Sequence, residues 1–194
     1  MNNELYMLRV EGEHAHAKSR YEVTQVEDYI NLVRDFLLTQ QGRLLSLNVH
    51  LPFEIQHPEI YPDLDRGLHF IRYGEGLKKI FGVPLYWENS PEIVYGSWEL
   101  KHGQTDWTHV PRDIELTLDT GHAMLGAKDK DDAQARIRAI LQEWGPQIKH
   151  LHLHENDLRG DEHWPVGEIL TPDFIAEISS GRTFIFEQGE VTSS

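Results

Sequence analysis

Segments with the pattern of a β-strand alternate with segments of helical periodicity along this 194-residue chain. Alternation of this kind favours βα units, in which consecutive strands lie parallel and helices cover the sheet. Strands are expected at six places, residues 6–10, 44–49, 83–88, 114–119, 148–154 and 183–187. The sequence therefore predicts a single α/β domain built on a parallel sheet.

The segments between these strands carry start and stop signals of helices. Thr24 and Glu27 have the spacing of a capping box, and Thr171-Pro172 supplies an N-cap followed by a proline in the first turn. Another helix is expected over residues 63–80, and a fourth ends at Gly145-Pro146. The segment 90–112 is less regular, and a short helix is expected there.

The composition restricts the partners of the protein. Its 32 acidic and 18 basic residues give a formal net charge of −14, and they include no basic run. Nucleic-acid binders neutralise phosphates with clustered Lys and Arg, so a nucleic-acid partner is not expected. No apolar stretch approaches the roughly 20 residues of a membrane span, and the N-terminus lacks the features of a secretory signal. A cytoplasmic protein without a membrane partner is expected.

Residues that can bind a metal ion stand where the expected strands end. Side chains alternate across a strand, and the C-terminal ends of parallel strands meet at one rim. The strand-end residues are His50, Glu88, Asp119, His152 and Glu187, together with His14 or His16 after the first strand. The sequence has no cysteine, so any metal must be held by histidine, carboxylate and water. Such ligands suit Zn, Mn, Co or Mg.

Each of these residues also has a simpler explanation. A lone strand-end carboxylate is more often a helix cap, and a lone buried histidine is more often a hydrogen-bonded core group. His150 is assigned to the core, whereas His154 stays open because it shares a strand face with His152 but lies nearer the loop. The joint pattern at the ends of several strands favours a metal site.

Five short motifs follow one another in the sequence: WEN at 87–89, LDTGH at 118–122, HLHEND at 152–157, DEHWPVGE at 161–168 and FIFE at 184–187. This series resembles the xylose-isomerase-like TIM-barrel superfamily, which includes sugar and sugar-phosphate isomerases and epimerases and also endonuclease IV. The resemblance implies a TIM-barrel-like parallel sheet with outer helices. Two departures are Gly167-Glu168-Ile169 in place of GEG and His154-Glu155-Asn156 in place of HDN.

The full barrel has eight βα units, and the six units expected here match its strands three to eight. The resemblance therefore implies one domain over residues 1–194 that is incomplete at its N-terminus. Missing strands would leave a sheet edge open. A second copy of the protein is one expected way to cover that edge.

In the isomerase and epimerase branch, the resemblance implies one divalent ion held by Glu88, Asp119, His152 and Glu187. The ion would acidify a C–H of a small sugar or sugar phosphate. Glu88 and Glu187 would then act as general base and acid. His122 would bind substrate oxygens, and Arg159 is the nearest basic candidate for a phosphate.

In the endonuclease IV branch, the resemblance implies up to three ions and hydrolysis of a phosphodiester. The matching ligand positions are His14 or His16, His50, Glu88, Asp119, His122, His152, Asp161, His163 and Glu187. A third alternative is a metal-binding barrel fragment without activity. The acidic balance of the sequence favours the sugar substrate.

Overall fold

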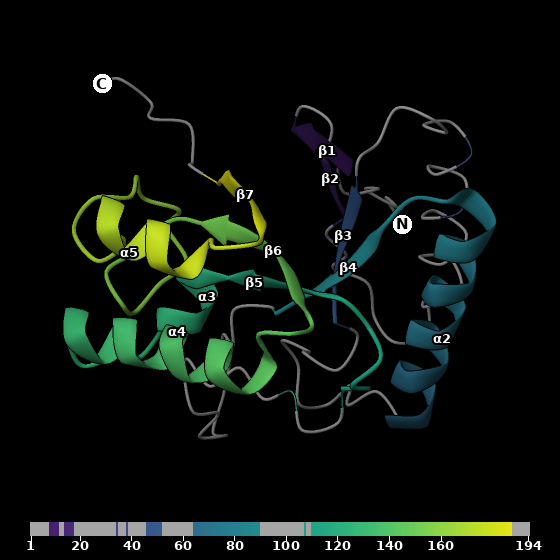
Figure 1. The fold of residues 1–194 in the computed structure, drawn as a ribbon, viewed down its shortest axis with the longest axis horizontal. Coiled ribbons are helices and arrows are strands. Elements are labelled where there is room, and N and C mark those ends of the chain that lie inside the picture. The colour runs from purple at the N-terminus through teal and green to yellow at the C-terminus, as the bar shows by residue number, and fades with distance from the viewer. Residues whose placement is uncertain are drawn as a thin grey trace, which may run out of the picture. The chain divides into compact units, whose positions relative to one another are not determined.

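The protein forms two compact units, residues 1–88 and residues 89–194. The computed structural model describes residues 8–11, 14–17, 34, 38, 46–51, 64–89, 107 and 110–187. Figure 1 labels the helices and strands of both units. Within these residues, no helix combines the length and the apolar character needed to cross a membrane.

The described residues of the first unit include four strands and a long helix. The elements are β1 (Leu8–Glu11), β2 (His14–Ala17), β3 (Ser46–His50), α2 (Leu64–Phe81) and β4 (Leu85–Glu88). Strands β2, β3 and β4 are parallel neighbours, whereas β1 runs antiparallel to β2. The register sets His50 beside Glu88, so the last residues of β3 and β4 are level.

In the described residues of the second unit, three parallel strands pack with helices (Figure 1). Its elements are β5 (Leu116–Asp119), α3 (Thr120–Met124), α4 (Lys130–Trp144), β6 (Ile148–Leu153), α5 (Pro172–Ile178) and β7 (Thr183–Phe186). Leu116, Leu118, Leu151 and Leu153 are fully buried, and so are the polar side chains that alternate with them on β5 and β6. Burial on both faces is typical of a parallel sheet in an α/β fold.

Capping residues fix where the helices of this unit begin. Asp129 accepts the backbone N–H of Asp132 at the start of α4, and Thr171 accepts that of Phe174 at the start of α5. At the N-terminal end of β6, the guanidinium of Arg182 donates hydrogen bonds to four backbone carbonyls, those of Gly145, Ile148, Ile178 and Ser180. This one residue therefore joins the C-terminal ends of α4 and α5 to the start of β6.

The structure confirms the α/β class and the parallel strands, with differences of one or two residues at most strand ends. It corrects the first strand. The parallel neighbour of β3 is His14–Ala17, a segment expected to lie in a loop, and its alternation of histidine and alanine is itself a strand pattern. The helix expected after Thr24 lies outside the described residues, apart from residues 34 and 38, which are helical. Within 90–112 the structure describes residues 107 and 110–112, which are not helical.

Two glycines of α2 differ sharply in their surroundings. A Cβ added at Gly74 would lie 2.6 Å from Cζ2 of Trp87, whose ring is buried, whereas one at Gly76 would meet nothing within 4 Å. Gly74→Ala is expected to lower the free energy of unfolding by about 1–3 kcal/mol through overpacking. Gly76→Ala is expected to raise it by about 0.5–1 kcal/mol through helix propensity.

Urea denaturation of the two variants, followed by circular dichroism, measures both changes. Gly76→Ala is the matched control, because it makes the same substitution in the same helix. Equal effects of the two variants would contradict the close packing of α2 on Trp87.

Candidate metal centre

Asp119, the last residue of β5, is held from both sides. Its backbone N–H donates to the side-chain oxygen of Asn89 (2.8 Å), and its carbonyl accepts from the amide nitrogen of Asn89 (3.0 Å). Its carboxylate Oδ1 accepts the backbone N–H of His122 (2.8 Å) as the N-cap of α3. These bonds fix both the backbone and the side chain of a fully buried acid.

Three buried side chains meet where the strands of this unit end. Asp119 and His152 are neighbours in the register of β5 and β6, and Glu187 directly follows β7. Nδ1 of His152 lies 3.1 Å from Oε2 of Glu187 and 3.9 Å from Oδ2 of Asp119. One ligand atom from each lies within 4.8 Å of the others. We call Asp119, His152 and Glu187 the strand-end group.

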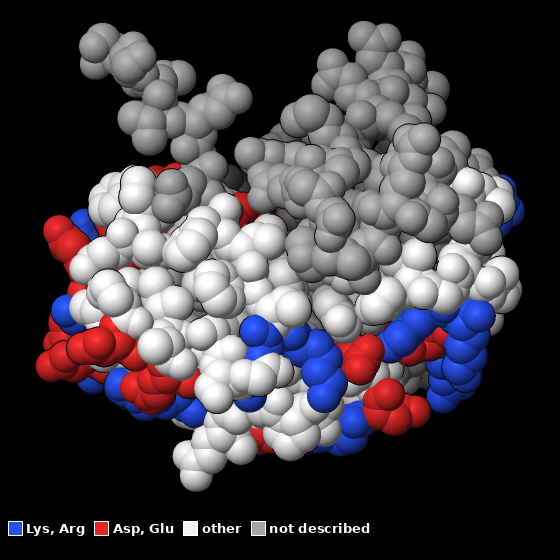
Figure 2. Space-filling view, turned by 45° about the horizontal axis from the view of Figure 1, so that its top comes forward, with Lys and Arg blue, Asp and Glu red and all other residues white. Residues whose placement is uncertain are grey.

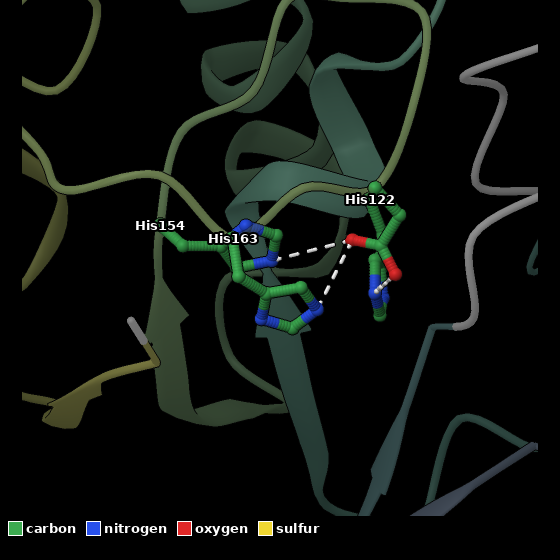
Figure 3. A group of neighbouring side chains, drawn as sticks. His122, His154 and His163 are labelled. Atoms are coloured by element: carbon green, nitrogen blue, oxygen red, sulfur yellow. Dashed lines mark ion pairs between the residues drawn. The ribbon is translucent and has the colours of Figure 1, made fainter. Parts of the chain in front are cut away.

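A second group combines three imidazoles with one carboxylate. Oδ2 of Asp161 lies 3.4 Å from Nε2 of His122, and Oδ1 lies 3.2 Å from Nε2 of His163 and 3.9 Å from Nε2 of His154. Figure 3 shows the three rings arranged around these ion pairs. The rings of His154 and His163 are stacked, with centroids 4.0 Å apart. We call His122, His154, Asp161 and His163 the loop group.

Backbone carbonyls orient two of these rings. Nδ1 of His122 lies 2.7 Å from the carbonyl oxygen of Asn89, and Nδ1 of His163 lies 3.2 Å from that of Glu187. A carbonyl only accepts, so each Nδ1 carries the proton and donates it. Nε2 of both rings then faces Asp161. Metal-binding histidines are commonly oriented by a hydrogen bond of this kind from the opposite ring nitrogen.

Gly121 makes room for the third ring. A Cβ at this position would overlap the imidazole of His154. Nε2 of His154 donates to Oδ1 of Asp119 (2.9 Å), which links the loop group to the strand-end group. The glycine of the DTGH motif is therefore required by a close approach.

The carboxylates of Asp119 and Asp161 are held in their ionised form. Burial alone raises the pKa of Asp119, but His122 and His154 outweigh it and hold the pKa below its usual value. Burial likewise raises the pKa of Asp161, yet hydrogen bonds from His122 and His163 hold it well below the usual range. Burial lowers the pKa of His163, but Asp161 outweighs this effect and raises it.

Both groups fit a divalent cation. They combine ionised carboxylates with imidazole nitrogens, which are the ligands that Zn and Mn accept. The negative charge of Glu187 acts against ionisation of Asp119, and a cation between two such buried carboxylates would remove that repulsion.

The structure brings together six of the residues expected from the sequence: Asp119, His122, His152, Asp161, His163 and Glu187. In the first unit, Nε2 of His50 lies 3.9 Å from Oε2 of Glu88. Arg159 is exposed, and its role at a phosphate stays a prediction.

The N-terminal histidines lie within a strand rather than in the segment after one, and their role as metal ligands stays a prediction. The register sets His14 beside Ser46 and His16 beside Asn48, so neither stands at the C-terminal end of a strand, which is Ala17. In the register with β3, His16 lies two residues before His50 and His14 lies four residues before it.

The sequence leaves the role of His154 open and does not indicate Asn89 as a partner of Asp119. The one signal for His154 is its position two residues after His152, on the same face of the strand. Nothing in the sequence indicates the direction of its ring.

The fold is similar to the solved structures of an epimerase-like protein and of a sugar epimerase. A D-tagatose 3-epimerase-like protein has a TM-score of 0.65 and 20% sequence identity, over 90% of this protein and 70% of its own length. The 3-keto-D-glucoside 4-epimerase of E. coli has a TM-score of 0.58 and 10% identity, over 93% of this protein and 73% of its own length. The likeness confirms the TIM-barrel-like α/β fold that the resemblance implied.

No protein-family model matches the sequence, and no curated protein matches it.

The opposed pKa shifts of Asp161 and His163 predict a pH window of stability. The lowered pKa of Asp161 stabilises the fold above its unfolded value of 3.8, and this contribution is lost as the pH falls through the folded value. The raised pKa of His163 stabilises the fold below its unfolded value of 6.5, and this contribution is lost as the pH rises through the folded value. The pair is expected to contribute most between pH 3.8 and 6.5.

Urea denaturation of the unaltered protein and of Asp161→Asn, both in EDTA, measures this contribution as a function of pH. The difference in unfolding free energy should be largest inside the window and should shrink on both sides. A difference that does not vary with pH would contradict the pairing of Asp161 with His163.

Proposed function

We propose that this protein is a divalent-metal-dependent isomerase or epimerase that acts on a sugar or sugar phosphate. The strand-end group carries the proposal, because it joins two carboxylates and an imidazole in a buried site. The similarity of the fold to a sugar epimerase and to a D-tagatose 3-epimerase-like protein supports it. Among the described residues on the face in Figure 2, acidic side chains lie among the basic ones, which suits a small substrate better than a nucleic acid.

In this proposal the ligands are Asp119, His152, Glu187 and, as the fourth, Glu88. A divalent ion bound there would polarise a carbonyl and a hydroxyl of the sugar and acidify the C–H between them. His152 and Asp119 hold their positions through buried contacts, and the carboxylate of Glu187 removes or returns the substrate proton. Glu88 performs the complementary transfer, as the resemblance implies.

The loop group has a separate role in this proposal. Nδ1 of His122 is engaged by a carbonyl and its Nε2 faces Asp161, an arrangement that suits a ligand of a second cation better than a contact to substrate oxygens. Asp161, His154 and His163 complete the ligands of that cation. The proposed stoichiometry is therefore two ions per protein molecule.

Metal removal and the Glu187→Gln variant test the proposal. After EDTA treatment the protein is reloaded with Mn, Co, Zn or Mg and incubated with a panel of ketoses in D₂O. Exchange of a carbon-bound hydrogen of the sugar for deuterium, followed by proton NMR, is expected only with the reloaded protein. Glu187→Gln is expected to lower the rate by about 10²–10⁴-fold, because it removes a general acid–base group.

Glu168→Gln is the matched control, since it makes the same charge change at an exposed side chain. Elemental analysis of every variant separates loss of the ion from loss of proton transfer. Exchange that is unaffected by EDTA, or a Glu187→Gln variant that retains both the ion and the full rate, would refute the proposal. Cleavage of an abasic-site duplex in place of sugar exchange would indicate a phosphodiesterase.

A further inference from the structure

The carboxylate of Glu155 is buried and bound by consecutive backbone amides. Its Oε1 accepts the N–H groups of Gly167, Glu168, Ile169 and Leu170 at distances of 2.7–3.0 Å. The residue is 5% exposed. Successive backbone N–H groups that converge in this way form a concave site for an anion, and here a side chain of the same protein fills it.

The backbone of Glu155 closes the same loop at a second point. Its N–H donates to the carbonyl of Trp164 (2.9 Å), and its carbonyl accepts the N–H of Trp164 (2.7 Å). Trp164 directly follows His163, and Glu155 directly follows His154. The bridge therefore fixes the backbone next to two imidazoles of the loop group, while the carboxylate fixes the segment that leads into α5.

The loop needs such support, because part of its backbone is strained. His163 has a φ of 53° and Leu158 a φ of 67°, in the left-handed region that non-glycine residues rarely adopt. Strained residues of this kind persist only where the surrounding structure holds them. The contacts of Glu155 with Trp164 and with residues 167–170 lie on the C-terminal side of His163 and supply that support.

We propose that Glu155 is a positioning residue, which sets Asp161 and His163 at the geometry that a cation in the loop group requires. The role rests on the two metal sites of the proposed function. Glu155 itself touches neither the ion nor the substrate in this assignment. It acts by holding one end of the loop, and the carbonyl of Glu187 holds the ring of His163 from the other side.

The Glu155→Gln variant tests this role, because it keeps the size of the side chain and removes its charge. The remaining oxygen is an uncharged and weaker acceptor for the amides of residues 167–170, and the new NH₂ group cannot accept the N–H of Glu168, which Oε2 accepts at 3.3 Å. In the metal-free protein, hydrogen exchange of these four amides should become faster. The affinity of the loop group for Zn should fall by about 10- to 100-fold, as expected for loss of an outer-shell contact, whereas the ion of the strand-end group should remain.

Equilibrium titration with Zn and elemental analysis give the number and affinity of the ions, with Asp161→Asn as the reference for loss of the second ion. Glu168→Gln is the matched control and should behave as the unaltered protein in both measurements. If Glu155→Gln does not fold, Glu155→Asp serves the same test, because the shorter aspartate does not reach the four amides.

The results separate the two proposals. Faster amide exchange with unchanged Zn affinity would overturn the positioning role and leave Glu155 as a structural group. An unaltered protein that binds no ion at either group would refute the proposed function and, with it, this role. Loss of the second ion alone in Glu155→Gln supports the assignment.

Discussion

The carboxylate of Asp119 is the contact on which the second unit depends. It ends β5, caps α3 through the backbone of His122 and accepts a hydrogen bond from Nε2 of His154. Because the neighbouring imidazoles keep its pKa low, it stays ionised despite complete burial. One charge therefore links a strand, a helix and both ligand groups, and Asn89 fixes the backbone that carries it. Burial of an ionised carboxylate contributes little to stability, so a buried acid with this many partners indicates a functional site.

Much of this arrangement follows from the sequence. Period-two alternation and the parallel order set Asp119, His152 and Glu187 at strand ends, and the capping residues Asp129 and Thr171 mark where two helices begin. Helix α3 escapes prediction because its five residues are too few to show a helical period. Strand β2 escapes it as well, because its four residues follow the first expected strand closely and are expected in the loop after it.

The parts that sequence does not predict depend on contacts between distant segments. The ring of His154 occupies space that only the missing side chain of Gly121 leaves free, and no periodic pattern reports a space of that kind. The four amides that bind Glu155 converge only after the loop has folded. The positive φ of His163 is likewise a result of the surrounding structure, since histidine has no strong preference for that conformation.

Arg182 stabilises the second unit at the end of β6 that lies away from the candidate metal ligands. Its guanidinium binds four carbonyls at the ends of α4 and α5 and at the start of β6, far along the strands from the residues that can ligate a metal. A lysine has no planar fork and does not reproduce these bonds. Because these bonds stabilise the N-terminal end of β6, the loops at the C-terminal ends of the strands can vary in sequence without loss of these contacts.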